Sequence, residues 1–229
     1  MREGGFRFGA VGGIPRLYPI LDAELVLRGW KDRAAERRTL LRRLVRELAE
    51  AGVEILQYRN KRDEDGVVLD DARAMREAAP GVRLILNDRP ALVTAAGWDG
   101  VHVGQEDLAA AEARALVGSA AIVGLSTHNE AQVTAADEEP VDYIATGPVF
   151  ATASKWDTSP VIGLDGVRRA RALTKKPLVA IGGITQETAR AVCDAGADAV
   201  AVIGAIFGSD GERGRSEAQR VRDFLAVFK

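Results

Sequence analysis

Short apolar segments rich in Val, Ile and Leu recur along the chain. Most of them are continuous rather than alternating, which is the pattern of parallel strands buried on both faces. We predict eight strands on this basis, at Leu17–Asp22, Val53–Arg59, Arg83–Asp88, Gly100–Gly104, Ala121–Ser126, Val141–Gly147, Leu178–Gly183 and Ala199–Ile203.

The segments between these strands show helical spacing. The segment Asp32–Ala51 is expected to carry Leu40, Leu41, Leu44 and Leu48 on one face, and Gly52 is placed to end the helix. Further helices are predicted at Asp107–Val117, Asn129–Glu138, Leu164–Leu173, Thr185–Ala195 and Glu217–Phe228.

Alternating strands and helices predict an α/β fold, a single-domain (β/α)8 TIM barrel over residues 17–229. Eight units across 229 residues leave about 29 residues for each, which is compact for this fold. A doubly wound Rossmann sheet is the competing architecture. It would use fewer strands, and no G-x-G-x-x-G follows the first strand. The glycine-rich residues 1–16 are expected to form a flexible leader.

The amino-acid composition limits the kinds of ligand and metal that the chain could bind. The 31 Lys and Arg residues nearly balance the 33 Asp and Glu residues, which argues against a nucleic-acid binder but allows a local anion site. A single cysteine excludes a cysteine-based zinc site, and two histidines are too few for a histidine-rich metal site. A bound metal would therefore take oxygen ligands, which favours Mg²⁺. No apolar run approaches the roughly 18 residues that span a membrane, so we expect a cytoplasmic protein and leave a homo-oligomer open.

Cations gather at the carboxyl ends of the predicted strands, where TIM barrels place their active sites. Arg59 and Lys61 follow the second strand, in alternating positions that would point the same way in an extended chain, and Lys155 follows the sixth. Three cations around one mouth need a counter-charge, which a diphosphate would supply. The alternative is that Arg59 and Lys61 are ordinary surface charges in a loop.

Two carboxylates follow neighbouring strands. Asp88 ends the third strand and Asp107 follows the fourth, so their side chains can converge. Beside three cations, such a pair is a pattern for Mg²⁺ bridged to a phosphate group. Each aspartate could instead cap the next helix, and the two roles are compatible.

Glycines and histidines complete the candidate chemistry. Gly182, Gly183 and Gly204 follow the last two strands, where barrels build phosphate sites from backbone N–H groups; the alternative is tight turns. His102 lies within a strand and is expected to be a hydrogen-bonded barrel residue. His128 could bind a ligand or cap a helix.

Seven segments together carry a family resemblance: QYRNK, NDR, DGVHVGQED, GLSTH, DYIATGPVFATASK, AIGGI and AGADAVAVIGAI. In order and spacing over residues 17–207, they resemble the thiamine-phosphate synthase family. The resemblance implies a transferase that joins 4-amino-2-methyl-5-(diphosphomethyl)pyrimidine to a thiazole phosphate with Mg²⁺, giving thiamine phosphate and diphosphate. These two small molecules would be its binding partners.

Carried over position by position, the resemblance implies three groups of site residues. The pyrimidine diphosphate would be bound by Gln57, Arg59, Lys61, Asn87, Ser126 and Lys155, with Arg59, Lys61, Ser126 and Lys155 catalytic. The thiazole phosphate would be bound by Thr152, Ser154, Gly183, Ile203 and Gly204, and Mg²⁺ by Asp88 and Asp107. Three positions depart from the family pattern: Asn60 replaces an acidic residue, Ser154 a threonine, and Gly204 a hydroxyl residue.

A sister branch of the family supplies the main alternative. It isomerises a thiazole carboxylate phosphate on the same barrel, with a histidine near the position of His128. That branch tends to lose the second metal carboxylate, whereas Asp107 is present here, which favours the synthase. A third hypothesis is a non-catalytic barrel that binds a phosphate ligand without turnover.

Overall fold

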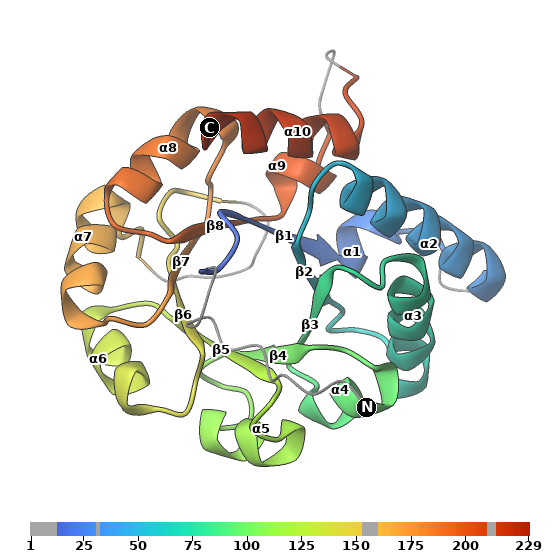
Figure 1. Cartoon of the computed structure of the whole chain (residues 1–229), viewed down its shortest axis with the longest axis horizontal. Coiled ribbons are helices and arrows are strands. Elements are labelled where there is room, and N and C mark those ends of the chain that lie inside the picture. The colour runs from blue at the N-terminus through green and yellow to red at the C-terminus, as the bar shows by residue number, and fades with distance from the viewer. Residues whose placement is uncertain (1–12, 31–32, 153–159, 210–213) are drawn as a thin grey trace.

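The computed structural model describes residues 13–30, 33–152, 160–209 and 214–229. The strands within these residues are parallel, pair in chain order and close between β8 and β1 into a barrel (Figure 1). Closure confirms the predicted TIM barrel and excludes the Rossmann sheet. Each predicted strand is observed, with ends shifted by two residues at most: β1 (Leu17–Asp22), β2 (Ile55–Arg59), β3 (Arg83–Asn87), β4 (Gly100–Val103), β5 (Ile122–Thr127), β6 (Tyr143–Thr146), β7 (Leu178–Ile181) and β8 (Ala199–Val202).

Helices form an outer ring around the strands (Figure 1). They are α1 (Ala23–Val26), α2 (Ala34–Glu50), α3 (Asp65–Ala78), α4 (Pro90–Ala96), α5 (Ala110–Val117), α6 (Glu130–Glu138), α7 (Gly163–Leu173), α8 (Gln186–Asp194), α9 (Gly204–Phe207) and α10 (Glu217–Val227). The sequence pattern does not predict α1, α3, α4 or α9. Helix α10 packs against both α2 and α8, which joins the two ends of the ring. In the part of the chain that the structure describes, no helix is long and apolar enough to cross a membrane.

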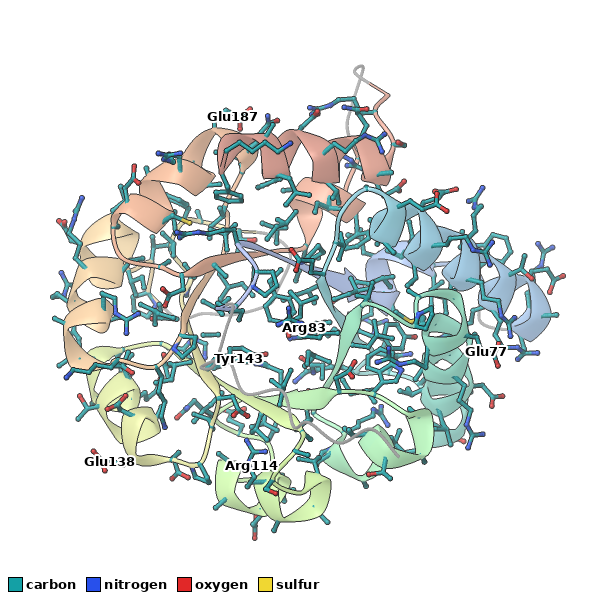
Figure 2. The ribbon with its side chains drawn as sticks, in the orientation of Figure 1. Glu77, Arg83, Arg114, Glu138, Tyr143 and Glu187 are labelled. Atoms are coloured by element: carbon teal, nitrogen blue, oxygen red, sulfur yellow. The ribbon has the colours of Figure 1, made fainter. Side chains whose placement is uncertain are left out.

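Strand side chains alternate between two buried layers, because successive residues of a strand point to opposite faces. Those that face the helices form the larger core, and those that face the barrel axis form a smaller inner core. Figure 2 shows Tyr143 and Arg83 inside the ring of strands, while Glu77 and Glu138 lie on the outer helices. The inner core includes Tyr18, Ile20, Ile55, Ile85, Ile122, Tyr143 and Val179.

A repeated ion pair, which we call the aspartate staple, fixes the amino-terminal end of the barrel. Just before or at the start of β4, β6 and β8, one aspartate carboxylate accepts a backbone N–H from the preceding strand, over 2.8 Å in each case. Each carboxylate also pairs with an arginine from the last turn of a helix. The three staples are Asp99 with Leu84 and Arg76, Asp142 with Val123 and Arg114, and Asp198 with Leu178 and Arg171.

Part of the segment predicted as a leader packs against the barrel. Ile14 is buried among the inner-core side chains, and the carbonyl of Arg16 accepts the backbone N–H of Val200 over 2.9 Å. The packed chain therefore begins before residue 17, earlier than predicted. Residues 1–12 lie outside the described part of the chain.

Candidate active site

The carboxyl ends of the strands gather polar side chains at one mouth of the barrel. Gln57 lies two positions beyond the inner-core Ile55, and Asn87 two beyond Ile85, so both point towards the barrel axis. Ser126, the last residue but one of β5, lies on the same side and is hydrogen-bonded to His102 of β4. The structure thus brings these three predicted pyrimidine ligands to one end of the barrel.

Lys61 lies between the two predicted metal ligands. Its Nζ is 2.8 Å from Oδ2 of Asp88 and 3.9 Å from Oδ1 of Asp107. A cation already sits where the two carboxylates meet, so their arrangement is one that binds positive charge. We call Lys61, Asp88 and Asp107 the acidic pair with its lysine.

Local backbone geometry holds both carboxylates in place. Asp107 accepts the backbone N–H of Gly104 over 2.8 Å, and a Cβ on Gly104 would lie only 2.7 Å from that carboxylate. Asp88 adopts a left-handed backbone (φ 60°), which aspartate tolerates better than most residues, and its N–H donates to the carbonyl of His102. Neither aspartate is the cap residue of the following helix: Arg89 precedes α4 and Ala109 precedes α5. The capping alternative is therefore wrong for both.

The two carboxyl groups also interact with one another. Burial raises the pKa of Asp88, Lys61 opposes the rise, and the hydrogen bond that Asp88 donates to Asp107 adds to it. Burial acts in the same direction on Asp107, but the hydrogen bonds from Asp88 and from the Gly104 N–H outweigh it and lower that pKa. The environment therefore pushes the pKa values of the two carboxyls apart, and the two groups titrate as a coupled pair.

Arg59 is held by a residue that the sequence reasoning did not single out. Its Nη1 donates to Oδ2 of Asp22 over 2.5 Å, and the two residues are register partners at the ends of β2 and β1. Only 15% of the Arg59 side chain is exposed, so it is not an ordinary surface charge. The signal was available, since Asp22 is the polar residue that ends the first apolar segment.

The loop after β2 is built by buried polar contacts. Asn60 accepts the backbone N–H groups of Arg62 and Asp63, and donates to the Tyr58 hydroxyl over 3.1 Å. Because Asn60 starts this turn, β2 ends at Arg59, and Lys61 does not continue the strand alternation. Arg59 reaches towards β1, whereas Lys61 reaches towards β3 and β4. Both predicted cations line the same mouth from separate directions.

Asn87 carries an unpaired donor inside the site. Its side chain is 7% exposed, and its Nδ2 has no hydrogen-bond partner among the described residues. A buried N–H group without a partner is costly, and the Asn87 donor is therefore available to an acceptor atom at this mouth. A phosphate oxygen is such an acceptor.

A separate cavity opens above β7 and β8. It has a volume of about 300 Å³ and is lined by residues that include Thr152, Gly182, Gly183, Ile203 and Gly204. Gly183 has a φ of 62°, and a Cβ there would lie 2.5 Å from the carbonyl oxygen of Ala151. Only glycine allows this close approach of two loops. Gly182 and Gly183 therefore form a tight turn that also shapes the cavity, and the phosphate site predicted for them stays a prediction.

Two predicted ligands cannot be placed. Ser154 and Lys155 lie outside the described residues, which stop at Thr152 and resume at Pro160. Of the five predicted thiazole phosphate ligands, Thr152, Gly183, Ile203 and Gly204 share the glycine-lined cavity.

The two histidines occupy different settings. His102 is buried and bonded on both ring nitrogens, to Tyr143 and to Ser126, which confirms the prediction of a hydrogen-bonded barrel residue. His128 Nδ1 lies 2.9 Å from the carbonyl oxygen of Gly147, and its backbone N–H donates to Gln132. His128 therefore supports the backbone around it.

The donor set fits a hard divalent cation that shares its coordination with a substrate. No group of three or more Asp, Glu, His or Cys side chains in the described residues could enclose a metal. Mg²⁺ is commonly bound by one or two carboxylates together with substrate phosphates and waters. Asp88 and Asp107, with the unpaired Asn87 donor nearby on β3, meet that requirement.

Comparison with known proteins identifies the family. The model of the thiamine monophosphate synthase family matches residues 30–206. This chain belongs to that family. A thiamine-phosphate synthase of Koribacter versatilis (strain Ellin345) is 49% identical over 216 residues, which is 94% of this chain and 96% of the relative. A thiamine-phosphate synthase of Chloroflexus aurantiacus is 39% identical over 197 residues, covering 85% of this chain and 86% of the relative.

A solved structure agrees with the sequence relatives. Thiamine phosphate pyrophosphorylase from Pyrococcus furiosus superimposes with a TM-score of 0.76 at 28% identity, covering 93% of this chain and 94% of that one. For a thiamine monophosphate synthase family member, the mouth with its paired carboxylates and the glycine-lined cavity are the natural candidates for the two substrate sites.

Proposed function

We propose that this chain is a thiamine-phosphate synthase that condenses 4-amino-2-methyl-5-(diphosphomethyl)pyrimidine with a thiazole phosphate. The observation that carries the proposal is Lys61 between Asp88 and Asp107 at the same end of the barrel as the glycine-lined cavity. One site suits a metal-bound diphosphate and the other a second, smaller phosphate. The curated relatives that share most of this chain bear the synthase name.

The pyrimidine diphosphate is proposed to lie over β2 to β5. Arg59, Lys61 and, from outside the described residues, Lys155 would bind the diphosphate, and the unpaired Asn87 Nδ2 would donate to one of its oxygens. Gln57 and Ser126 would hydrogen-bond the pyrimidine ring. The cations come from separate loops, which favours an extended, multiply charged ligand over a single phosphate.

Asp88 and Asp107 are proposed to hold Mg²⁺, and Lys61 would then turn from Asp88 to the diphosphate. When bound, the metal supplies positive charge that neutralises the diphosphate oxygens. The geometry supports this role because Asp107 is fixed by the Gly104 N–H and Asp88 by its backbone bond to His102.

The thiazole phosphate is proposed to occupy the glycine-lined cavity. Backbone N–H groups around Gly183, Ile203 and Gly204 would bind its phosphate, with Thr152 and, outside the described residues, Ser154 adding hydroxyls. Gly204 offers no side-chain hydroxyl, so this subsite would rely more on backbone donors than one with the hydroxyl residue of the family pattern. We expect a correspondingly weaker affinity for the thiazole phosphate.

The proposed reaction transfers the pyrimidine methylene group from a diphosphate oxygen to the thiazole nitrogen. The bond between the methylene carbon and the diphosphate oxygen breaks, and its electron pair leaves with diphosphate. Arg59, Lys61 and Lys155 stabilise the departing charge. The methylene cation is then captured by the lone pair of the thiazole nitrogen, held in line by the second subsite. That nitrogen carries no proton, so no protein base is needed, which fits a site whose histidines are engaged in structure.

A product assay tests this function. The purified chain is incubated with both substrates and Mg²⁺, and the mixture is separated for thiamine phosphate, diphosphate and each thiazole species. We expect thiamine phosphate and diphosphate in equal amounts, and none when Mg²⁺ is removed with a chelator. Rearrangement of the thiazole without condensation would assign the chain to the isomerase branch. Binding of both substrates without any product would make it a non-catalytic phosphate binder.

A further inference from the structure

A continuous line of hydrogen bonds crosses the barrel interior beneath the mouth. Gln57 Nε2 donates to the Tyr18 hydroxyl over 3.2 Å, and that hydroxyl lies 2.9 Å from the hydroxyl of Tyr143. The Tyr143 hydroxyl is 2.9 Å from Nδ1 of His102, whose Nε2 is 2.8 Å from the Ser126 hydroxyl. We call these five residues the interior relay. Its two ends, Gln57 and Ser126, are the residues proposed to bind the pyrimidine ring.

The middle of the interior relay is rigidly packed. Tyr18 and Tyr143 are fully buried in the inner core, and their rings meet edge to face with centroids 5.8 Å apart. His102 stacks on Tyr143 at 5.5 Å. The Tyr143 ring lies inside the ring of strands (Figure 2), in space that a side chain at position 124 would fill: a Cβ on Gly124 would come within 2.0 Å of its Cζ. Glycine at 124 therefore makes room for the relay's central member.

Counting protons gives the interior relay a direction. A hydroxyl donates one hydrogen bond, and a neutral imidazole donates from one nitrogen and accepts at the other. Burial raises the pKa of both tyrosines, so each keeps its proton. The contacts between the tyrosines and with His102 do not by themselves fix a donor, so we take the direction from Gln57: with its Nε2 donating to Tyr18, the relay runs from the Tyr18 hydroxyl to Tyr143 and from the Tyr143 hydroxyl to Nδ1 of His102.

This direction assigns the two ends. A neutral His102 that accepts at Nδ1 would carry its proton on Nε2 and donate to the Ser126 oxygen. The Ser126 hydrogen is then left to donate into the mouth, and at the other end Gln57 Oε1 is the atom left to accept. If all four bonds are kept, reversing the bond at Gln57 reverses each of the others, so the relay couples the hydrogen-bonding character of Gln57 to that of Ser126.

We propose that the interior relay sets the donor and acceptor pattern of the pyrimidine site, which makes Tyr18, Tyr143 and His102 positioning residues for the first substrate. This inference rests on the proposed function. An aminopyrimidine offers N–H donors on its amino group and lone-pair acceptors on its ring nitrogens, which match an acceptor at Gln57 and a donor at Ser126. A 4-oxo analogue presents the opposite pattern at the amino edge, and the relay selects against it.

Removing one hydroxyl from the middle of the interior relay tests the inference. Tyr143→Phe keeps the ring and breaks the connection, so either end can turn independently. We expect KM for the pyrimidine diphosphate to rise about tenfold, and the preference for the substrate over its 4-oxo analogue, measured as an inhibitor, to fall by a similar factor. KM for the thiazole phosphate should stay unchanged. Tyr18→Phe should give the same result, and it replaces Tyr143→Phe in the test if that variant folds poorly.

Thr174→Val is the matched control. Thr174 is 5% exposed and bonded to Asp137 and to the backbone of Lys176, at the amino-terminal face of the barrel. This variant loses buried hydrogen bonds of similar number without touching the relay. Its stability should fall like that of the tyrosine variants, while its KM values and analogue preference should match those of the unaltered chain. Unchanged pyrimidine KM and preference in both folded tyrosine variants would overturn the inference.

A spectroscopic measurement tests the direction of the relay without any substrate. The chain has two histidines, so ¹⁵N shifts of the imidazoles can be assigned with a His128→Gln variant. We expect His102 to be neutral and protonated on Nε2. Protonation on Nδ1, or on both nitrogens at neutral pH, would refute the relay whether or not the protein turns over. Absence of turnover by the unaltered chain would refute the proposed function and leave this readout intact.

Discussion

Arg59 and Lys61, the two predicted cations that the structure describes, are each held by an aspartate at the end of another strand. Asp22 fixes Arg59, and Asp88 fixes Lys61, each within hydrogen-bond distance. Side chains that are already oriented at the mouth lose less freedom when a charged ligand arrives. The same pairing keeps several buried charges compensated before substrate binds.

The first prediction concerns Asp107. Asp107→Asn keeps an oxygen that accepts the Gly104 N–H but removes the charge that faces Lys61 and the metal. We expect Mg²⁺-dependent kcat/KM to fall on the order of 100-fold, as when other charge-stabilising groups are removed from a site. Urea unfolding of the apoprotein should shift slightly to lower urea, because the lowered pKa of Asp107 means that its ionised form stabilises the folded chain.

Asp70→Asn is the matched control for Asp107→Asn. Asp70 lies on α3 with 59% of its side chain exposed, and its ion pair with Arg38 is long at 3.9 Å. It should leave kcat/KM and unfolding unchanged. Turnover of Asp107→Asn at the rate of the unaltered chain would remove Asp107 from the metal site.

A second prediction concerns the glycine-lined cavity. Gly183→Ala adds a methyl group that would lie 2.5 Å from the carbonyl oxygen of Ala151, and it places alanine at a φ of 62°. We expect KM for the thiazole phosphate to rise at least about tenfold, since the loops must move apart and the backbone donors with them. KM for the pyrimidine diphosphate should change little.

Gly163→Ala separates the two effects of that substitution. Gly163 has nearly the same φ, 63°, but a Cβ there meets no atom within 4 Å. It shares the backbone strain of Gly183→Ala without the clash, so it should lose stability and keep its thiazole KM. Equal thiazole KM values in the two variants would show that the cavity wall does not bind this substrate.

At the scale of elements, the strands were predictable and some helices were not. The strands can be recognised in the sequence as apolar runs because both of their faces are buried. Helix α3 gives no such signal, because it begins inside the charged stretch after Lys61. Its buried face also mixes small and charged side chains with apolar ones: Val68, Asp71, Ala72 and Met75. Asp71 is acceptable there because Arg37 pairs with it, a contact between segments far apart in the sequence.

A third prediction belongs to the aspartate staple. Asp142→Ala leaves the buried N–H of Val123 without its carboxylate and frees Arg114. We expect the free energy of unfolding to fall by about 1–3 kcal/mol, the usual cost of an unpaired buried donor. Because the staple lies at the amino-terminal face, both KM values should be unchanged. Chemical denaturation and steady-state kinetics measure the two effects.

Asp165→Ala is the comparison for the staple. Asp165 pairs with Arg168 on the exposed surface of α7, with 79% of its side chain accessible. Such pairs contribute little, so its unfolding free energy should change by less than about 0.5 kcal/mol. An equally small loss in Asp142→Ala would mean that the staple does not stabilise the barrel.

At the scale of the whole molecule, the barrel separates stability from chemistry. The staples gather at the amino-terminal face, whereas the cations, the acidic pair and the glycine-lined cavity gather at the other. Sequence reasoning located the second face well, because the polar ends of apolar segments are visible in the printed chain. It missed Asp22 and the Tyr18–Tyr143 contact, since these depend on which strands become neighbours when the barrel closes.

The central claim is that this mouth joins two phosphate-bearing substrates with the help of a metal. Following one reaction by ³¹P NMR tests it most directly. With both substrates and Mg²⁺, the diphosphate ester signals should be replaced by free diphosphate, one equivalent for each thiamine phosphate formed. Omitting either the thiazole phosphate or Mg²⁺ should prevent product formation. Persistence of both substrates in the complete mixture, with the chain folded, would contradict the account.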